Sequence, residues 1–94
     1  MRGDEMTTIW KFPIPIQDSF TLKVPGQAFS PLAVQVQDGT PCLWGIVNDS
    51  ALVTAVFTFR LFGTGHEIPT TGTFNYIGTF QLAGYVWHLF GERQ

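Results

Sequence analysis

The sequence predicts an all-β fold, either a six-to-seven-stranded antiparallel β-sandwich or a small, partly closed barrel. Short segments that alternate apolar and polar residues recur along the chain, with turn residues between them every 8–12 residues or so. No segment with the 3.6-residue periodicity of an α-helix is long enough to predict a helix. Aromatic residues make up 15% of the 94 residues, which is compatible with a ring-filled core.

The length allows one domain and is too short for two domains with separate cores. We expect residues 1–6 to be a flexible leader that need not be native. Residues 7–90 form the single β domain of this prediction, and residues 91–94 form a tail.

The first two predicted strands cover residues 7–12 (TTIWKF) and 20–24 (FTLKV), and both alternate. Pro13 and Pro15 lack the amide hydrogen that a β-ladder requires, so the first strand should end there or lie at a sheet edge. Pro25-Gly26 closes the second strand with a turn.

Residues 32–37 and 42–47 are predicted to form a hairpin, because Asp38-Gly39 supplies the positive φ that a tight turn needs. Pro41 removes a donor, which favours a loop of about four residues over one of two. Gly45 lies inside the second of these strands. It marks either a bulge or a place where an aromatic ring lies over the backbone.

Residues 53–62 form the longest and most apolar predicted strand, against which the others pair or pack. Phe57, Phe59 and Leu61 point to one face, and Arg60 points to the other. A loop follows at residues 63–72. Residues 74–82 and 85–90 then form two strands joined by a tight Ala83-Gly84 hairpin, and the last strand is apolar on both faces, so it is central or lies in an interface.

Charged residues make up only 13% of the chain, and the formal net charge is −2. A surface this poor in charge favours a homo-oligomer or an obligate partner. The five basic residues are scattered, so binding of double-stranded nucleic acid is not expected. No apolar run reaches the roughly 18 residues of a membrane span, so no membrane association is predicted. The lone Cys42 excludes an internal disulfide and favours a reducing compartment, which predicts a cytoplasmic protein.

The strongest candidate for recognition is the loop Gly63-Thr64-Gly65-His66. On a functional interpretation, Thr64 and His66 present polar groups to a ligand from a loop on a rigid sheet. On a structural interpretation, the two glycines supply positive φ at the strand end and His66 is solvated. Arg60 pairs with a carboxylate on a neighbouring strand or holds an anionic ligand beside His66.

Trp44, Tyr85 and Trp87 are candidate partner contacts, since exposed aromatic rings are enriched at interface hot spots and can stack on bases. The alternative is that they fill the core. His88 is interpreted as a partly buried histidine that holds a backbone group. No catalytic residue, metal ligand or cofactor is predicted, because no motif places a nucleophile, a base and an acid together and no CxxC or HxxxH spacing occurs.

Three runs, VQVQDGTPCLWGIV, FRLFGTGHEI and YIGTFQLAGYVWHLF, resemble a family of short uncharacterised proteins encoded by bacteriophages and prophages. Members of that family begin near an IWK segment like the one at residues 9–11. The resemblance implies a protein made inside a bacterial host cell, and it carries no catalytic residues. The sequence thus predicts a non-enzymatic phage accessory protein that acts through self-association or binding of a host protein. The alternatives are a nucleotide-like ligand-binding oligomer and a minor phage structural protein.

Overall fold

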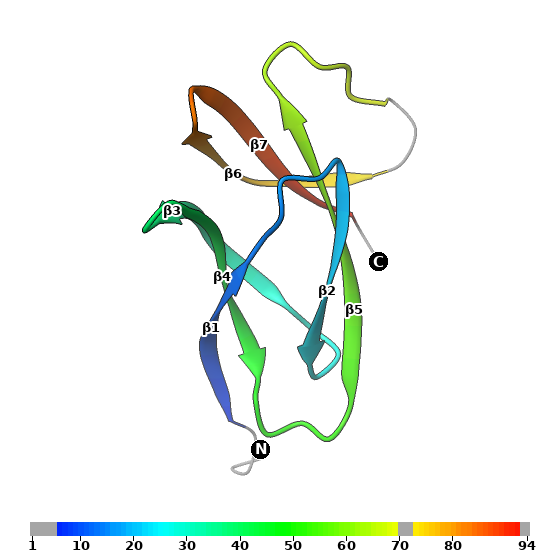
Figure 1. The fold of residues 1–94 in the computed structure, drawn as a ribbon. Coiled ribbons are helices and arrows are strands. Elements are labelled where there is room, and N and C mark those ends of the chain that lie inside the picture. The colour runs from blue at the N-terminus through cyan, green and yellow to red at the C-terminus, as the bar shows by residue number, and fades with distance from the viewer. Residues whose placement is uncertain (1–5, 70–72, 93–94) are drawn as a thin grey trace.

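The computed structural model describes residues 6–69 and 73–92, and this part of the chain contains seven β-strands (Figure 1). The strands are β1 (Thr7–Pro13), β2 (Ser19–Pro25), β3 (Ser30–Gln37), β4 (Thr40–Asn48), β5 (Thr54–Gly63), β6 (Phe74–Leu82) and β7 (Tyr85–Glu92). Residues 1–5 of the predicted leader and residues 93–94 of the predicted tail lie outside the described residues. The described residues hold no helix with the length and hydropathy needed to cross a bilayer.

The strands form two antiparallel sheets, one in the order β1-β4-β3 and one in the order β2-β5-β7-β6. The predicted all-β fold is therefore confirmed. Of the two predicted architectures, the sandwich is formed, because no ladder joins the two sheets among the described strands. Strand β3 lies against β6 across the interface, and a β-carbon on Gly78 would meet Val34 Cγ1 at 2.7 Å.

Pro13 and Pro41 of the three-stranded sheet differ in their effect on the strands. Strand β1 ends at Pro13 and lies at a sheet edge, as predicted. The β3–β4 loop has two residues, not the predicted four, with Gln37 opposite Thr40 and positive φ at Asp38 and Gly39. Pro41 is tolerated because it pairs with Val36, the second pair from the turn. That pair is a non-hydrogen-bonded pair, so the missing amide hydrogen does not face β3.

Strand β5 is the longest strand and pairs with both β2 and β7, and β7 is central in its sheet, as predicted. Phe59 and Leu61 are buried between the sheets, whereas Arg60 lies on the outer face. Strand β7 continues to Glu92, two residues beyond its predicted end. Three pairs extend it, Phe59 with Gly91 on one side and Asn75 with Gly91 and Phe74 with Glu92 on the other.

The core lies between the sheets and consists of aliphatic and phenylalanine side chains: Ile14, Phe20, Val34, Leu43, Phe59, Leu61, Phe80 and Leu89. Phe29, which precedes β3, packs against this core and lies on Gly45 of β4. The prediction that a ring covers the backbone at Gly45 is thus confirmed. Burial of each such side chain contributes about 1.5–3 kcal/mol of transfer free energy.

Candidate functional site

The loop that leaves β5 folds back on its own first residue. The Gly63 amide donates to Nδ1 of His66 at 3.1 Å, and the His66 amide donates to the Gly63 carbonyl at 3.0 Å. A β-carbon on Gly63 would stand 2.9 Å from Cε1 of His66, so Gly63 provides space for the imidazole. The prediction of positive φ is therefore correct for Gly65 and wrong for Gly63.

The same loop contacts the first residues of β7. The Thr64 amide donates to the Val86 carbonyl at 3.2 Å. The His66 ring lies 6.4 Å from the Trp87 ring in an edge-on arrangement with an interplanar angle of 74°. These contacts hold the imidazole beside an indole, and they bring the loop over the hairpin that joins β6 to β7.

A pocket of about 510 Å³ lies between this loop and β7, and we call it the β5–β7 pocket; its lining residues are Gly63, Thr64, His66, Gly84, Tyr85, Val86 and Trp87. The volume falls within the roughly 300–1,000 Å³ of small-molecule sites. Tyr85 is 67% exposed, and its ring lies 6.3 Å from the ring of Trp87. The structure therefore brings four predicted contact residues to one place, the histidine, the threonine and two of the three aromatic residues.

The other two predicted contact residues lie elsewhere. Trp44 is on β4 of the opposite sheet, paired with Lys11 and Ala33. The Arg60 guanidinium lies 3.5 Å from the Glu92 carboxylate, on the outer face of the four-stranded sheet. The predicted pairing of Arg60 with a carboxylate on a neighbouring strand is confirmed, and Arg60 does not line the β5–β7 pocket.

Thr64 also begins a chain of hydrogen bonds that runs from the loop after β5 across strands β7 and β6. Its hydroxyl lies 2.8 Å from Nε2 of His88, and Nδ1 of His88 lies 3.0 Å from the Thr79 hydroxyl. The Thr79 hydroxyl lies 2.6 Å from the Tyr76 hydroxyl. We call these four residues the hydroxyl chain. His88 thus holds two threonine hydroxyls, and the prediction that it holds a backbone group is wrong.

One family matches the chain. It is described as a domain of unknown function, DUF7352, and the match covers residues 6–94. The chain belongs to the DUF7352 family. No curated protein and no solved structure matches it. The matched range includes all seven strands, so the β5–β7 pocket and the hydroxyl chain both belong to the DUF7352 domain.

The hydroxyl chain of this DUF7352 domain can run in either direction. A neutral imidazole donates from one nitrogen and accepts at the other, whereas a hydroxyl does both. If Nε2 of His88 carries the proton, the Thr64 hydroxyl hydrogen is free to point into the pocket. If Nδ1 carries it, Thr64 donates to His88 and offers the pocket an acceptor. The pocket can therefore satisfy a ligand donor or a ligand acceptor at one position.

Thr64 and His88 stand at the distance of a nucleophile and its base, but the third group is the neutral Thr79. A hydroxyl does not stabilise an imidazolium as a carboxylate does, so this geometry suits recognition better than covalent catalysis. Cys42 lies buried in β4 of the other sheet. Within residues 6–69 and 73–92, no three His, Cys, Asp or Glu side chains gather into a cluster of metal-binding geometry.

Reasoning from the sequence did not identify Tyr76, Thr79 and His88 as a group. The sequence nevertheless held one signal that two of them would meet, namely the length of a hairpin loop. A two-residue hairpin at Ala83-Gly84 places Thr79 opposite His88, and this is the observed pairing. The sequence held no such signal for the contact between Thr64 and His88, because that contact depends on the register between β5 and β7.

Proposed function

We propose that this DUF7352 domain is a non-enzymatic, small phage accessory protein that acts through protein–protein contacts. The observation that carries the proposal is the exposed Tyr85 ring at a pocket that Trp87 and His66 also line. Tyrosine and tryptophan are enriched among the residues that dominate binding free energies, because they bury a large area and lose few rotamers.

The composition supports the same function. Only 13% of the residues are charged, so little charge must be desolvated when the surface is covered. The partner in this proposal is a second copy of the chain or a host protein. The phage context rests on the resemblance of three sequence runs, and the cytoplasmic location rests on the single free thiol at Cys42.

Two measurements test the proposal, with Tyr85→Ala and His66→Ala as test variants. Size-exclusion chromatography with light scattering reports self-association, and affinity capture from host lysate reports a host partner. Trp44→Ala is the matched control, since it removes an aromatic ring from the opposite sheet. We expect the two pocket variants to lose the dimer or the captured protein and the control to keep it. A parent protein that is monomeric at high concentration and captures nothing in a Tyr85-dependent manner would contradict the proposal.

A second candidate function, the binding of a small nucleotide-like ligand, is favoured by the volume of the β5–β7 pocket. Trp87 and Tyr85 offer ring faces on which a base can stack, and Thr64 offers a hydrogen bond of either sense. Native mass spectrometry of the protein purified from infected cells should then show a retained ligand that Trp87→Leu loses. If no ligand is retained and no nucleoside or nucleotide raises Tm, this candidate is excluded.

A further inference from the structure

Strand β1 is an open edge of the three-stranded sheet, because β4 lies on one side of it and no described strand lies on the other. Figure 1 shows β1 on the outside of the molecule, away from the loop after β5. It shares no residue with the β5–β7 pocket. The edge of β1 is therefore a separate surface of the domain.

The backbone groups of alternate β1 residues point away from the sheet. The amide of Ile14, directly after β1, donates to the Pro41 carbonyl of β4 at 3.0 Å. Because hydrogen-bonded and non-hydrogen-bonded pairs alternate in an antiparallel ladder, the even-numbered residues of β1 bond to β4 and the odd-numbered residues do not. The amide and carbonyl groups of Thr7, Ile9 and Lys11 consequently face the open edge.

The side chains of β1 do not protect this edge. Ile9 is 56% exposed and Trp10 is 40% exposed, and the two lie on opposite faces of the strand. A lysine commonly keeps an edge strand from pairing with another chain. In β1, however, the Lys11 ammonium group donates to the side-chain oxygen of Gln37 at 2.7 Å, so the side chain reaches across β4 to β3. The charge is thus held over its own sheet.

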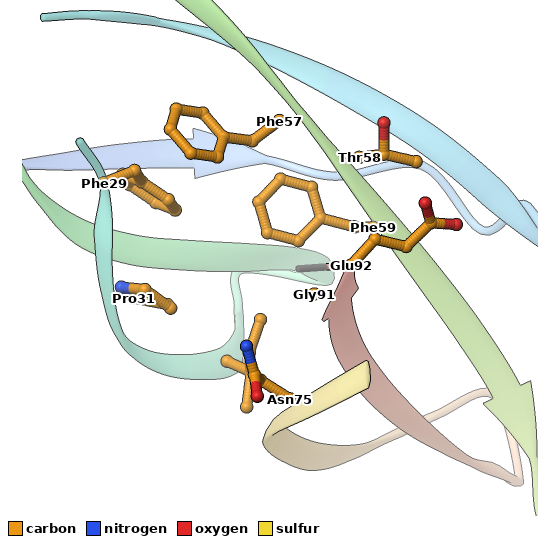
Figure 2. A pocket seen from close by; sticks show the side chains of 9 residues that line it. Phe29, Pro31, Phe57, Thr58, Phe59, Asn75, Gly91 and Glu92 are labelled. Atoms are coloured by element: carbon orange, nitrogen blue, oxygen red, sulfur yellow. The ribbon is translucent and has the colours of Figure 1, made fainter. Parts of the chain in front are cut away.

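The edges formed by β3 and β6 are unsuited to a further strand. A β-carbon on Gly78 of β6 would meet Val34 of β3 at 2.7 Å, so these two strands lie against each other. Figure 2 shows Pro31 of β3 and Asn75 of β6 on the lining of one shared pocket. Each strand also carries a register shift, in β3 next to Pro31 and in β6 next to Gly78. Bulges of this kind interrupt regular pairing.

Strand β2 is the remaining edge, and it differs from β1 in its side chains. The Leu61 amide donates to the Asp18 carbonyl at 3.0 Å, so by the same alternation Ser19, Thr21 and Lys23 direct their backbone groups outward. All seven residues of β2 are described, and none is an exposed large apolar side chain. Strand β2 therefore has free backbone groups but no exposed apolar area for pairing to bury.

We propose that β1 pairs in antiparallel orientation with β1 of a second copy of the chain, with Ile9 on the two-fold axis. Ile9 then faces Ile9 of the second copy, and Thr7 faces Lys11 of the second copy. All three outward residues of each chain exchange backbone hydrogen bonds, and the two three-stranded sheets become one continuous sheet.

The chemistry of the strand disfavours the neighbouring registers. An axis at Trp10 would oppose Thr7 to Pro13, and the missing amide hydrogen of Pro13 would leave the Thr7 carbonyl unpaired. An axis at Lys11 would set two ammonium groups against each other, and like charges directly opposite are destabilising. With Ile9 on the axis, the two exposed isoleucines meet and the two lysines stand at opposite ends of the contact.

Ile9→Lys tests the surface, because it sets two like charges against each other on the axis. Ile9 is exposed, so the fold should be retained, which circular dichroism checks. We expect size-exclusion chromatography with light scattering over a dilution series to show a dimer for the parent. The dissociation constant of that dimer should be at least about tenfold higher for Ile9→Lys. Thr21→Lys is the matched control, since it places the same charge at an outward position of the β2 edge, and it should dimerise as the parent does.

Cysteine cross-linking tests the register. The Cα atoms of a hydrogen-bonded antiparallel pair lie about 5.5 Å apart, which a disulfide can span. Ile9→Cys should therefore give a covalent dimer on mild oxidation. Lys11→Cys should not link to itself, because its two copies stand about 13 Å apart along the strands. Cys42 is buried, so the parent should give no covalent dimer.

The proposal is overturned if the parent stays monomeric at high concentration, or if folded Ile9→Lys dimerises as the parent does. Self-linking of Lys11→Cys without that of Ile9→Cys would overturn the register.

This inference deepens the proposed function, because it names the surface through which copies of the chain meet and leaves the β5–β7 pocket to a host protein. The two can fail separately. If Tyr85→Ala abolishes the dimer and Ile9→Lys keeps it, the copies meet at the pocket and the β1 contact is wrong. If Ile9→Lys abolishes the dimer and Tyr85→Ala changes neither the dimer nor capture from host lysate, the β1 contact stands and the proposed role of the pocket is wrong.

Discussion

The ring of Phe29 lies on the backbone of Gly45, so closely that a β-carbon at position 45 would stand 2.2 Å from Cε1 of the ring. Phe29 also contacts the rings of Phe12 of β1 and of Phe57 and Phe59 of β5. The glycine in one sheet thus makes room for the ring that contacts the other sheet. The two sheets can pack together in this way only because Gly45 has no side chain.

Gly45→Ala should therefore destabilise the domain by about 2 kcal/mol or more, because the Phe29 ring must leave its position. Urea denaturation measures the loss. In a Phe29→Ala background the same substitution should cost much less, since no ring remains to clash. If the costs of the two substitutions simply add, Phe29 is not the reason for the glycine.

Ala83→Asn should stabilise the domain by about 1 kcal/mol. Ala83 has φ of +53°, which strains an alanine, whereas asparagine followed by glycine is favoured in a type I′ turn. Asp38 occupies the same turn position in the β3–β4 hairpin with φ of +52°. Asp38→Ala is accordingly the reciprocal control and should lower the free energy of unfolding. Thermal and urea denaturation measure both changes, and a destabilising Ala83→Asn would contradict the strain argument.

Thr79→Val should cost about 1 kcal/mol of stability, because it keeps the shape of the side chain and removes the hydroxyl between His88 and Tyr76. Thr79→Ser keeps the hydroxyl and should cost less. The difference between the two variants in urea denaturation isolates the hydrogen bonds from the lost methyl group. Equal stabilities would mean that water replaces the threonine hydroxyl without loss.

Arg60→Met should change the free energy of unfolding by no more than about 1 kcal/mol, although it removes an ion pair. The Nε atom of Arg60 is buried without a hydrogen-bond partner in the described structure, and its removal offsets part of the loss. The rings of Phe62 and Phe74, 5.5 and 5.6 Å from the guanidinium carbon, can pack on the methionine. Arg60→Ala removes the packing against those rings and should lower the free energy of unfolding by about 2 kcal/mol. If both variants are equally unstable in urea, the charge and not the packing is what matters.

Much of the site was accessible from the sequence because its parts are local. The glycines and polar side chains of residues 63–66 mark a loop at the end of a strand, and Ala83-Gly84 marks a hairpin. Tyr85 and Trp87 share one face of β7 because side chains alternate along a strand. Local patterns therefore identified four members of the β5–β7 pocket. They did not show that the four residues meet.

Alternation and turn chemistry determined the strands, the faces of β5 and the tight Ala83-Gly84 hairpin, since these features depend on residues within a few positions of each other. Tertiary structure decided the rest. The loop of Pro41 was predicted too long because the consequence of a missing amide hydrogen depends on which edge it faces, and that is set by register. Only pairing between distant strands joined Thr64 to His88 and placed Gly91 beside Phe59. Because such pairing is settled by how the two faces pack in three dimensions, no local pattern could show that these residues meet.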